Sequence, residues 1–308
     1  MMQAAIAVAL FCTCAFGVIA PAVARRIAPP AATWMLTIGG LLAALTGIGV
    51  LALLAVTVVG QNHEVAAYGH WSIAALRRAD PIARPVALVA LVLFGLLSVC
   101  AAVTLLRRAR ALRVAYRTCQ HLPEHGGIVV LPDIGVDAYA LPGRPGRIVV
   151  TRGMLRVLGV NERRALLAHE RSHLRHGHHW HAAATAVAAS LNPSLARLPA
   201  ASKYAIERWA DEDAAREVPR ATAAHALLQA AAATAPVRAR PRASLAAAGN
   251  AVAQRIHALE AGPTRPRPVL LGIAVGTVVI AFVAAVVAAE QTAELFVSAM
   301  KATGSGAG

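Results

Sequence analysis

The stretch ALLAHERSHLRHGHHW, residues 165–180, holds five histidines and one glutamate. His169, Glu170 and His173 within it form the pattern H-E-x-x-H. Asn161 is a plausible N-cap, and Glu162 would then stand in the first helical turn, where the helix dipole favours a carboxylate. The pattern therefore predicts a helix from about 161 that continues through AAATAVAAS to about 190.

Two histidines four residues apart lie one turn apart on nearly the same face of a helix. The imidazoles of His169 and His173 can therefore reach one metal ion from the same side. Glu170 points about 100° further around the axis, too far for a third ligand but close enough to touch a water on the metal. Zinc hydrolysis needs this division of roles, because the ion lowers the pKa of its water and a carboxylate moves the proton to the leaving amine. Glu170 is the candidate general base and acid.

A third zinc ligand has to come from elsewhere in the chain, because a catalytic zinc usually has three protein ligands and one open position. Glu207 lies 34 residues after His173, in the segment AIERWADEDAA, which is predicted to be helical over about 200–217. Asp211 is one turn beyond Glu207 and faces the same way. It is the candidate to accept a hydrogen bond from the free ring nitrogen of a liganding histidine.

The sequence gives weaker evidence for a role of other polar residues in the site. We interpret the remaining histidines as a solvated or headgroup-facing continuation of the helix: His176, His178, His179 and His181. Four side chains are candidates to stabilise an oxyanion, and the sequence does not choose among them: Tyr139, Tyr204, Arg208 and His225.

The composition is that of a membrane protein, with 57% hydrophobic and 15% charged residues and a mean hydropathy of +0.57. A helix needs about 20 mostly apolar residues to cross a bilayer. Four stretches without Asp, Glu, Lys or Arg qualify, at about 3–24, 33–59, 85–106 and 268–289. The first ends in an A-x-A-like triplet that a signal peptidase could accept. We favour an uncleaved span, because no positive residue precedes the apolar run and Arg25 and Arg26 follow it.

The arginines near the span ends predict the orientation. Arg25 and Arg26 and the five arginines over 107–117 lie on one side, which the positive-inside rule makes cytoplasmic. We expect three spans in residues 1–106, a cytoplasmic peptidase domain at 107–267, and a fourth span with a short tail at 268–308 of a multi-pass cell-membrane protein.

The formal charge of +15 is concentrated in the middle of the chain, where residues 107–267 contain 24 Lys and Arg against 11 Asp and Glu. This charge predicts contact with anionic lipid headgroups. No nucleic acid is expected as a partner, because the region is tethered at both ends and lacks a nucleic-acid reading motif.

A short β segment precedes the histidine-rich helix. Residues 127–150, GIVVLPDIGVDAYALPGRPGRIVV, predict two or three strands, with GRPG closing a hairpin between AYAL and RIVVT. Two further helices are expected near 221–234 and 243–261. The fold class is a mainly α membrane protein with four transmembrane helices and a small inserted α+β domain.

HERSH followed by E-R-W-A-D resembles the gluzincin arrangement H-E-x-x-H … E-x-x-A-D of HtpX-type and Ste24-type membrane proteases and of BlaR/MecR antirepressor-type peptidases. The resemblance covers about residues 85–290, and the order of spans is closest to the BlaR/MecR layout. It implies a zincin-like domain, zinc bound by His169, His173 and Glu207, and endopeptidase action on a regulator or membrane protein at the cytoplasmic face.

The same resemblance implies that the strand before the metal helix, around Arg147–Thr151, is an edge strand that holds an extended polypeptide substrate. The chain departs from the BlaR/MecR layout in having fewer than 20 residues after the last span, so a β-lactam sensing role is not implied.

Two alternatives remain. A zinc-handling transporter or sensor would use HGHHWH as a cytosolic metal-binding loop, but it predicts ionisable ligands inside the spans, and the four apolar stretches have no acidic or basic side chain. A catalytically inactive signalling homologue stays open, although no ligand is missing. The oligomeric state is not determined by the sequence.

Overall fold

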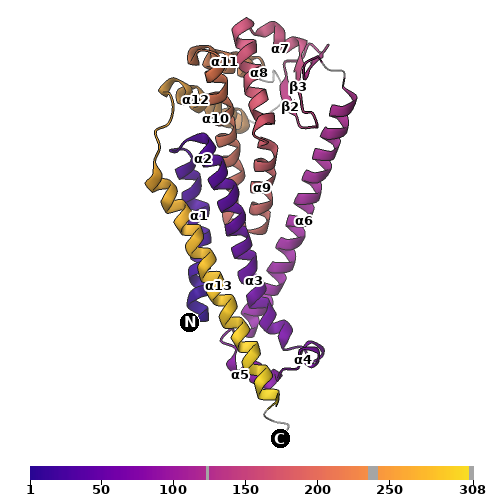
Figure 1. Cartoon of the computed structure of the whole chain (residues 1–308), viewed down its shortest axis with the longest axis vertical. Helices are drawn as coiled ribbons and strands as arrows, with labels where there is room; N and C mark the ends of the chain where they lie inside the picture. The colour runs from indigo at the N-terminus through magenta and orange to yellow at the C-terminus, as the bar shows by residue number, and fades with distance from the viewer. Residues whose placement is uncertain (123–124, 235–241, 305–308) are drawn as a thin grey trace.

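The computed structural model describes residues 1–122, 125–234 and 242–304, with side chains for all of these except 242–249 and 303–304. The N-terminal part is helical (Figure 1): α1 (Met2–Ala24), α2 (Pro29–Trp34), a π-helical turn η1 (Met35–Gly39), α3 (Gly40–Gly60), α4 (His63–Gly69), α5 (Ile73–Ala79) and α6 (Arg84–His121). A small sheet and its helices follow: β1 (Ile128–Leu131), β2 (Ala138–Leu141), β3 (Arg147–Thr151), α7 (Arg152–Val157) and α8 (Val160–Arg175). The chain ends in helices: α9 (His178–Leu191), a 3₁₀ turn η2 (Pro193–Leu195), α10 (Leu198–Glu217), α11 (Arg220–Thr234), α12 (Arg242–Ala261) and α13 (Pro268–Gly304).

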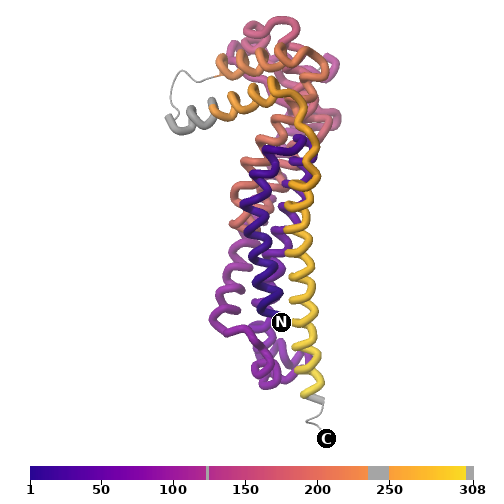
Figure 2. Tube along the Cα trace, turned by 90° about the vertical axis from the view of Figure 1, so that its left-hand side faces the viewer, coloured from indigo at the N-terminus to yellow at the C-terminus, as the bar shows by residue number. Residues whose placement is uncertain are grey.

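Four helical segments are long and apolar enough to cross a membrane, and they coincide with the four expected stretches: Met2–Ala24, Pro29–Gly60, Arg84–His121 and Pro268–Ala302. They run side by side along the long axis of the molecule, with the sheet at one end and α4 and α5 at the other (Figures 1 and 2). The last two helices continue beyond their apolar stretches because good helix formers such as Ala, Leu and Arg follow. These helices indicate membrane association, while the side on which the sheet lies stays a prediction.

The hairpin formed by α9, η2 and α10 is inserted between the spans. Leu195 and Leu198 are fully buried in a core that also contains Phe16 of α1 and Leu36 of η1. Glycines make room for the tip of the hairpin, since a Cβ at Gly17 would stand 2.2 Å from the Ser194 carbonyl oxygen. The segment after the metal helix is therefore packed against the spans, while the predicted domain boundaries at 107 and 267 stay predictions.

The sheet has the order β1-β3-β2, with β1 parallel and β2 antiparallel to β3. The predicted hairpin between AYAL and RIVVT is confirmed, since Tyr139 pairs with Val149. The expectation that Arg147–Thr151 is an edge strand is wrong. β3 is the central strand, and all of its residues are buried, because the apolar run GIVVL forms β1 along its other side. In the described chain, β2 pairs with β3 alone and keeps one edge free.

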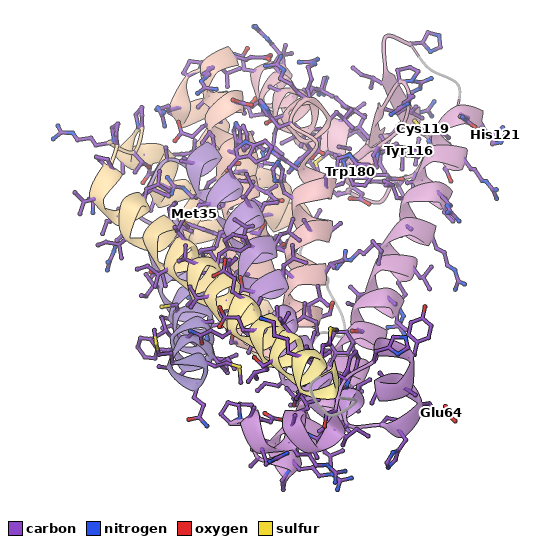
Figure 3. All side chains as sticks on the ribbon, turned by 60° about the horizontal axis from the view of Figure 1, so that its bottom comes forward. Met35, Glu64, Tyr116, Cys119, His121 and Trp180 are labelled. Atoms are coloured by element: carbon purple, nitrogen blue, oxygen red, sulfur yellow. The ribbon has the colours of Figure 1, made fainter. Side chains whose placement is uncertain are left out.

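The C-terminal end of α6 is connected to the β2–β3 turn. The Cys119 thiol donates to the Pro145 carbonyl oxygen over 3.4 Å, and Figure 3 shows Cys119 and Tyr116 together near the end of α6. The sheet is thereby held beside the third candidate span.

The metal helix differs from its prediction at both ends. The N-cap of α8 is Gly159 and not Asn161, although Glu162 does lie in the first turn. The helix also does not continue to 190. It ends at Arg175, and Gly177 adopts a left-handed conformation with φ 60° before α9 begins. Glycine has no Cβ to oppose positive φ, so the break occurs there.

Candidate metal centre

Three side chains from two packed helices converge on one point. Helix α8 presents His169 and His173, and α10 presents Glu207, with one potential ligand atom of each within 4.8 Å of the others. The two Nε2 atoms are 3.2 Å apart, and Glu207 carboxylate oxygens lie 3.5 Å from Nε2 of His169 and 3.9 Å from Nε2 of His173. Ligands bonded tetrahedrally to zinc at about 2.0–2.2 Å stand roughly 3.3–3.6 Å from one another. The donor set and its spacing therefore fit zinc, and within the described residues this is the one such group.

Asp211 holds the first histidine of this group. Its carboxylate lies 3.0 Å from Nδ1 of His169 and is itself buried. Burial opposes a charge on His169, but the hydrogen bonds to Asp211 and Glu207 outweigh it and raise the pKa of His169 to about 10. A metal ion has to displace the proton on Nε2, while the Nδ1 proton remains directed at Asp211.

Glu170 is beside the three candidate ligands and is 7% exposed. Burial raises the pKa of its carboxyl to about 7, and a hydrogen bond from the backbone of Ala140 in β2 partly offsets this effect. A carboxylate with a pKa near neutrality is suited to both accepting and returning a proton. Because the Ala140 backbone donates to its carboxylate, Glu170 lies between the free edge of the sheet and the candidate metal position.

The interpretation of the following histidines as solvated is wrong for His178 and His181, which are 3% and 5% exposed. The break at Gly177 directs the chain into the bundle, so these side chains become buried. His181 Nδ1 lies 2.9 Å from the Thr37 hydroxyl of η1. His178 Nδ1 lies 2.8 Å from Nδ1 of His173, and burial lowers the pKa values of His173 and His178 to about 4 and about 3.

Arg255 of α12 also belongs to the centre, although no motif in the sequence marks it. Its guanidinium forms two hydrogen bonds of 2.7 Å to the Asp211 carboxylate and lies 3.0 Å from Glu207. Burial works against the charge on Glu207, but its hydrogen bond to His169 and the charge of Arg255 hold its pKa well below the usual range. The only sequence signal is a single cation in the mostly apolar segment AVAQRIHALE, which is too weak to assign.

We expect Arg255→Met to destabilise the zinc-free protein, because it leaves the Glu207 and Asp211 carboxylates without their shared cation. Breaking a buried ion pair by removing one partner costs about 3–5 kcal/mol. Denaturant titration in detergent micelles measures the change. The control is Arg171→Met, since Arg171 forms an exposed pair with Glu217, and such pairs contribute about 0–1 kcal/mol. Equal losses in the two variants would contradict the role of Arg255.

Two cavities meet at the centre. One of ≈ 290 Å³ lies among α8, α10, α11 and α12, and one of ≈ 720 Å³ lies among β2, α6, α9 and α10. Four residues line both cavities: Ala138, His169, Glu170 and Glu207. The smaller cavity is lined mainly by Ala, Leu and Val, whereas the lining of the larger one includes Arg108 and Lys203.

The structure separates the four oxyanion candidates. Tyr139 of β2 lines the larger cavity. The other three have partners away from the centre: Tyr204 stacks with Arg25, Arg208 donates to Thr264, and His225 pairs with Glu162. Of the four candidates, Tyr139 is the one that lines a cavity at the centre.

The centre combines two imidazoles and one carboxylate on packed helices with a second carboxylate beside them. A free strand edge lies across the cleft. This arrangement is typical of a metallopeptidase. Residues 104–237 match the family model of peptidase family M48, and the matched region includes α8 and α10 with all of the candidate ligands. The match supports an M48 metallopeptidase. No curated protein and no solved structure matches the chain at a significant level.

Proposed function

We propose that the chain is a membrane-integral zinc endopeptidase that cleaves a regulator or membrane protein at the cytoplasmic membrane surface. The observation that carries the proposal is the convergence of His169, His173 and Glu207, with Glu170 next to them, at the edge of β2. The four candidate spans and the hairpin inserted between them support a site close to the bilayer. The BlaR/MecR-type layout stays a prediction from the order of the spans.

The substrate would bind along β2 and not along β3. The Thr151 N–H donates to the Asp137 carbonyl oxygen over 3.0 Å, so the backbone of Asp137 faces β3. Alternation in an antiparallel pair then turns the N–H and C=O groups of Ala138 and Ala140 toward the free edge. An extended polypeptide paired with this edge would pass from one cavity to the other across the centre, so that side chains on both sides of the scissile bond are enclosed.

The residues of this chain have distinct tasks in the proposed reaction. A zinc ion held by the three ligands supplies Lewis acidity, which acidifies a water molecule and polarises the scissile carbonyl. Glu170 accepts the proton of the attacking water and delivers it to the leaving amine. Asp211 keeps His169 in the tautomer that presents Nε2, and the backbone of β2 orients the substrate. Tyr139, which is 41% exposed at the cleft, is the candidate donor to the oxyanion.

Zinc analysis and proteolysis by the purified full-length protein test the proposal. We expect about one zinc per chain and cleavage of casein, or of the protein itself, that stops on chelation and resumes when zinc is returned. A folded protein that binds zinc but cleaves nothing under these conditions would support the inactive signalling homologue instead. A protein that binds no zinc would exclude the proposed peptidase.

A further inference from the structure

His178 lies in a position that a continuous helix would not give it. Five residues on a helix correspond to a rotation of about 140°, so His178 would point away from His173 if α8 continued unbroken. The left-handed Gly177, with φ 60°, interrupts the helix between them. The first turn of α9 therefore folds back, and the two imidazole rings meet with Nδ1 atoms 2.8 Å apart.

The geometry determines which ring nitrogen of His173 has which task. Its Nε2 faces the Nε2 of His169 at 3.2 Å and the Glu207 carboxylate at 3.9 Å, so Nε2 is the atom available to a metal. A neutral imidazole that binds through Nε2 carries its proton on Nδ1. That proton points at Nδ1 of His178, which must therefore accept it and carry its own proton on Nε2.

Ring packing holds His178 on its other sides, since its Nε2 is buried without a hydrogen-bond partner among the described residues. Its ring contacts the indole of Trp209 with centroids 5.1 Å apart, and Trp209 is stacked on His176 at 4.3 Å. Trp209 follows Glu207 by two residues on α10, so the packing links both helices that supply ligands. The His181–Thr37 hydrogen bond of 2.9 Å attaches α9 to η1 of the second candidate span. With 3% of its surface exposed, His178 has little freedom to move away from His173.

We propose that His178 is the positioning residue for His173, accepting the Nδ1 proton so that Nε2 is presented to zinc. The inference rests on the proposed zinc site. The two histidine ligands would then be held differently, His169 by the Asp211 carboxylate at 3.0 Å and His173 by a neutral imidazole. Partners of this kind contribute about 10–100-fold to metal affinity.

Three variants of the full-length protein separate positioning from packing. His178→Phe keeps a ring against Trp209 but removes the acceptor, whereas His178→Asn places a carbonyl oxygen close to the position of Nδ1. His179→Phe is the matched control, because His179 is the next residue and lines the same cavity but forms no hydrogen bond to a candidate ligand among the described residues. Each variant is first compared with the parent protein by thermal melting in the presence of a chelator.

Zinc affinity, measured by competition with a chromophoric chelator, and the visible spectrum of the Co²⁺-substituted protein are the readouts. We expect His178→Phe to raise the zinc dissociation constant about 10–100-fold and to shift the Co²⁺ bands. His178→Asn should recover most of the affinity, and His179→Phe should match the parent. Parental affinity and spectrum in His178→Phe would overturn the proposal.

A measurement on the parent protein covers the case in which His178→Phe does not fold. ¹⁵N NMR of the zinc-loaded, histidine-labelled protein should place a proton on Nδ1 of His173 and on Nε2 of His178. A proton on Nδ1 of His178 would overturn the assignment. Absence of zinc binding by the parent protein would instead remove the proposed function itself, whereas bound zinc with the wrong tautomer removes only the role of His178.

Discussion

Glu170→Gln is expected to reduce peptide hydrolysis by at least about 10²–10⁴-fold, the range that a positioned general base contributes. The amide has nearly the shape of the carboxylate but cannot accept the proton of water at neutral pH. Zinc content should stay at about one per chain, because the three ligand atoms come from other side chains. Initial rates on a fluorogenic peptide or casein, measured beside metal analysis of the same sample, give both quantities.

Glu162→Gln is the matched control for this experiment. It is the same substitution on the same helix, but Glu162 is in the first turn of α8 and pairs with His225, away from the centre. Its rate should equal that of the parent protein. If Glu170→Gln cleaves as fast as Glu162→Gln, Glu170 is not the base and the proposed mechanism is wrong.

Glu207→Ala is expected to weaken zinc binding by more than about 100-fold, because loss of a ligand exceeds the 10–100-fold effect of removing a group that only holds a ligand. Cleavage should be lost together with the metal. The variant also frees the Arg255 guanidinium from one of its two carboxylates, which leaves a positive charge close to the metal position and adds to the loss. Equilibrium dialysis with zinc and the increase in melting temperature on zinc addition are the measurements.

Glu217→Ala controls for a change of charge on the same helix. Glu217 is exposed at the end of α10 and pairs with Arg171, so its removal should leave the zinc affinity unchanged. A Glu207→Ala protein that retains parental affinity would show that Glu207 serves only as a partner of Arg255. The third ligand would then have to be sought elsewhere.

Much of the centre could be anticipated from short sequence spacings. His169 and His173 are one helical turn apart, as are Glu207 and Asp211, and the structure brings these four side chains into one cluster. The β2–β3 hairpin and the four long apolar helices were likewise predictable from local composition. The zinc, the substrate and the roles of the individual residues stay predictions.

The sequence by itself determined which side chains share a face of each helix. A period of 3.6 residues makes side chains one turn apart neighbours, whatever the rest of the chain does. Only the tertiary structure decided that β1 covers one side of β3 and leaves β2 as the free edge. It also decided that Arg255 reaches Glu207 and that the break at Gly177 brings His178 to His173. These contacts depend on how elements that are distant in sequence pack against one another and bury their surfaces from water. The spacing of residues within one element does not contain that information.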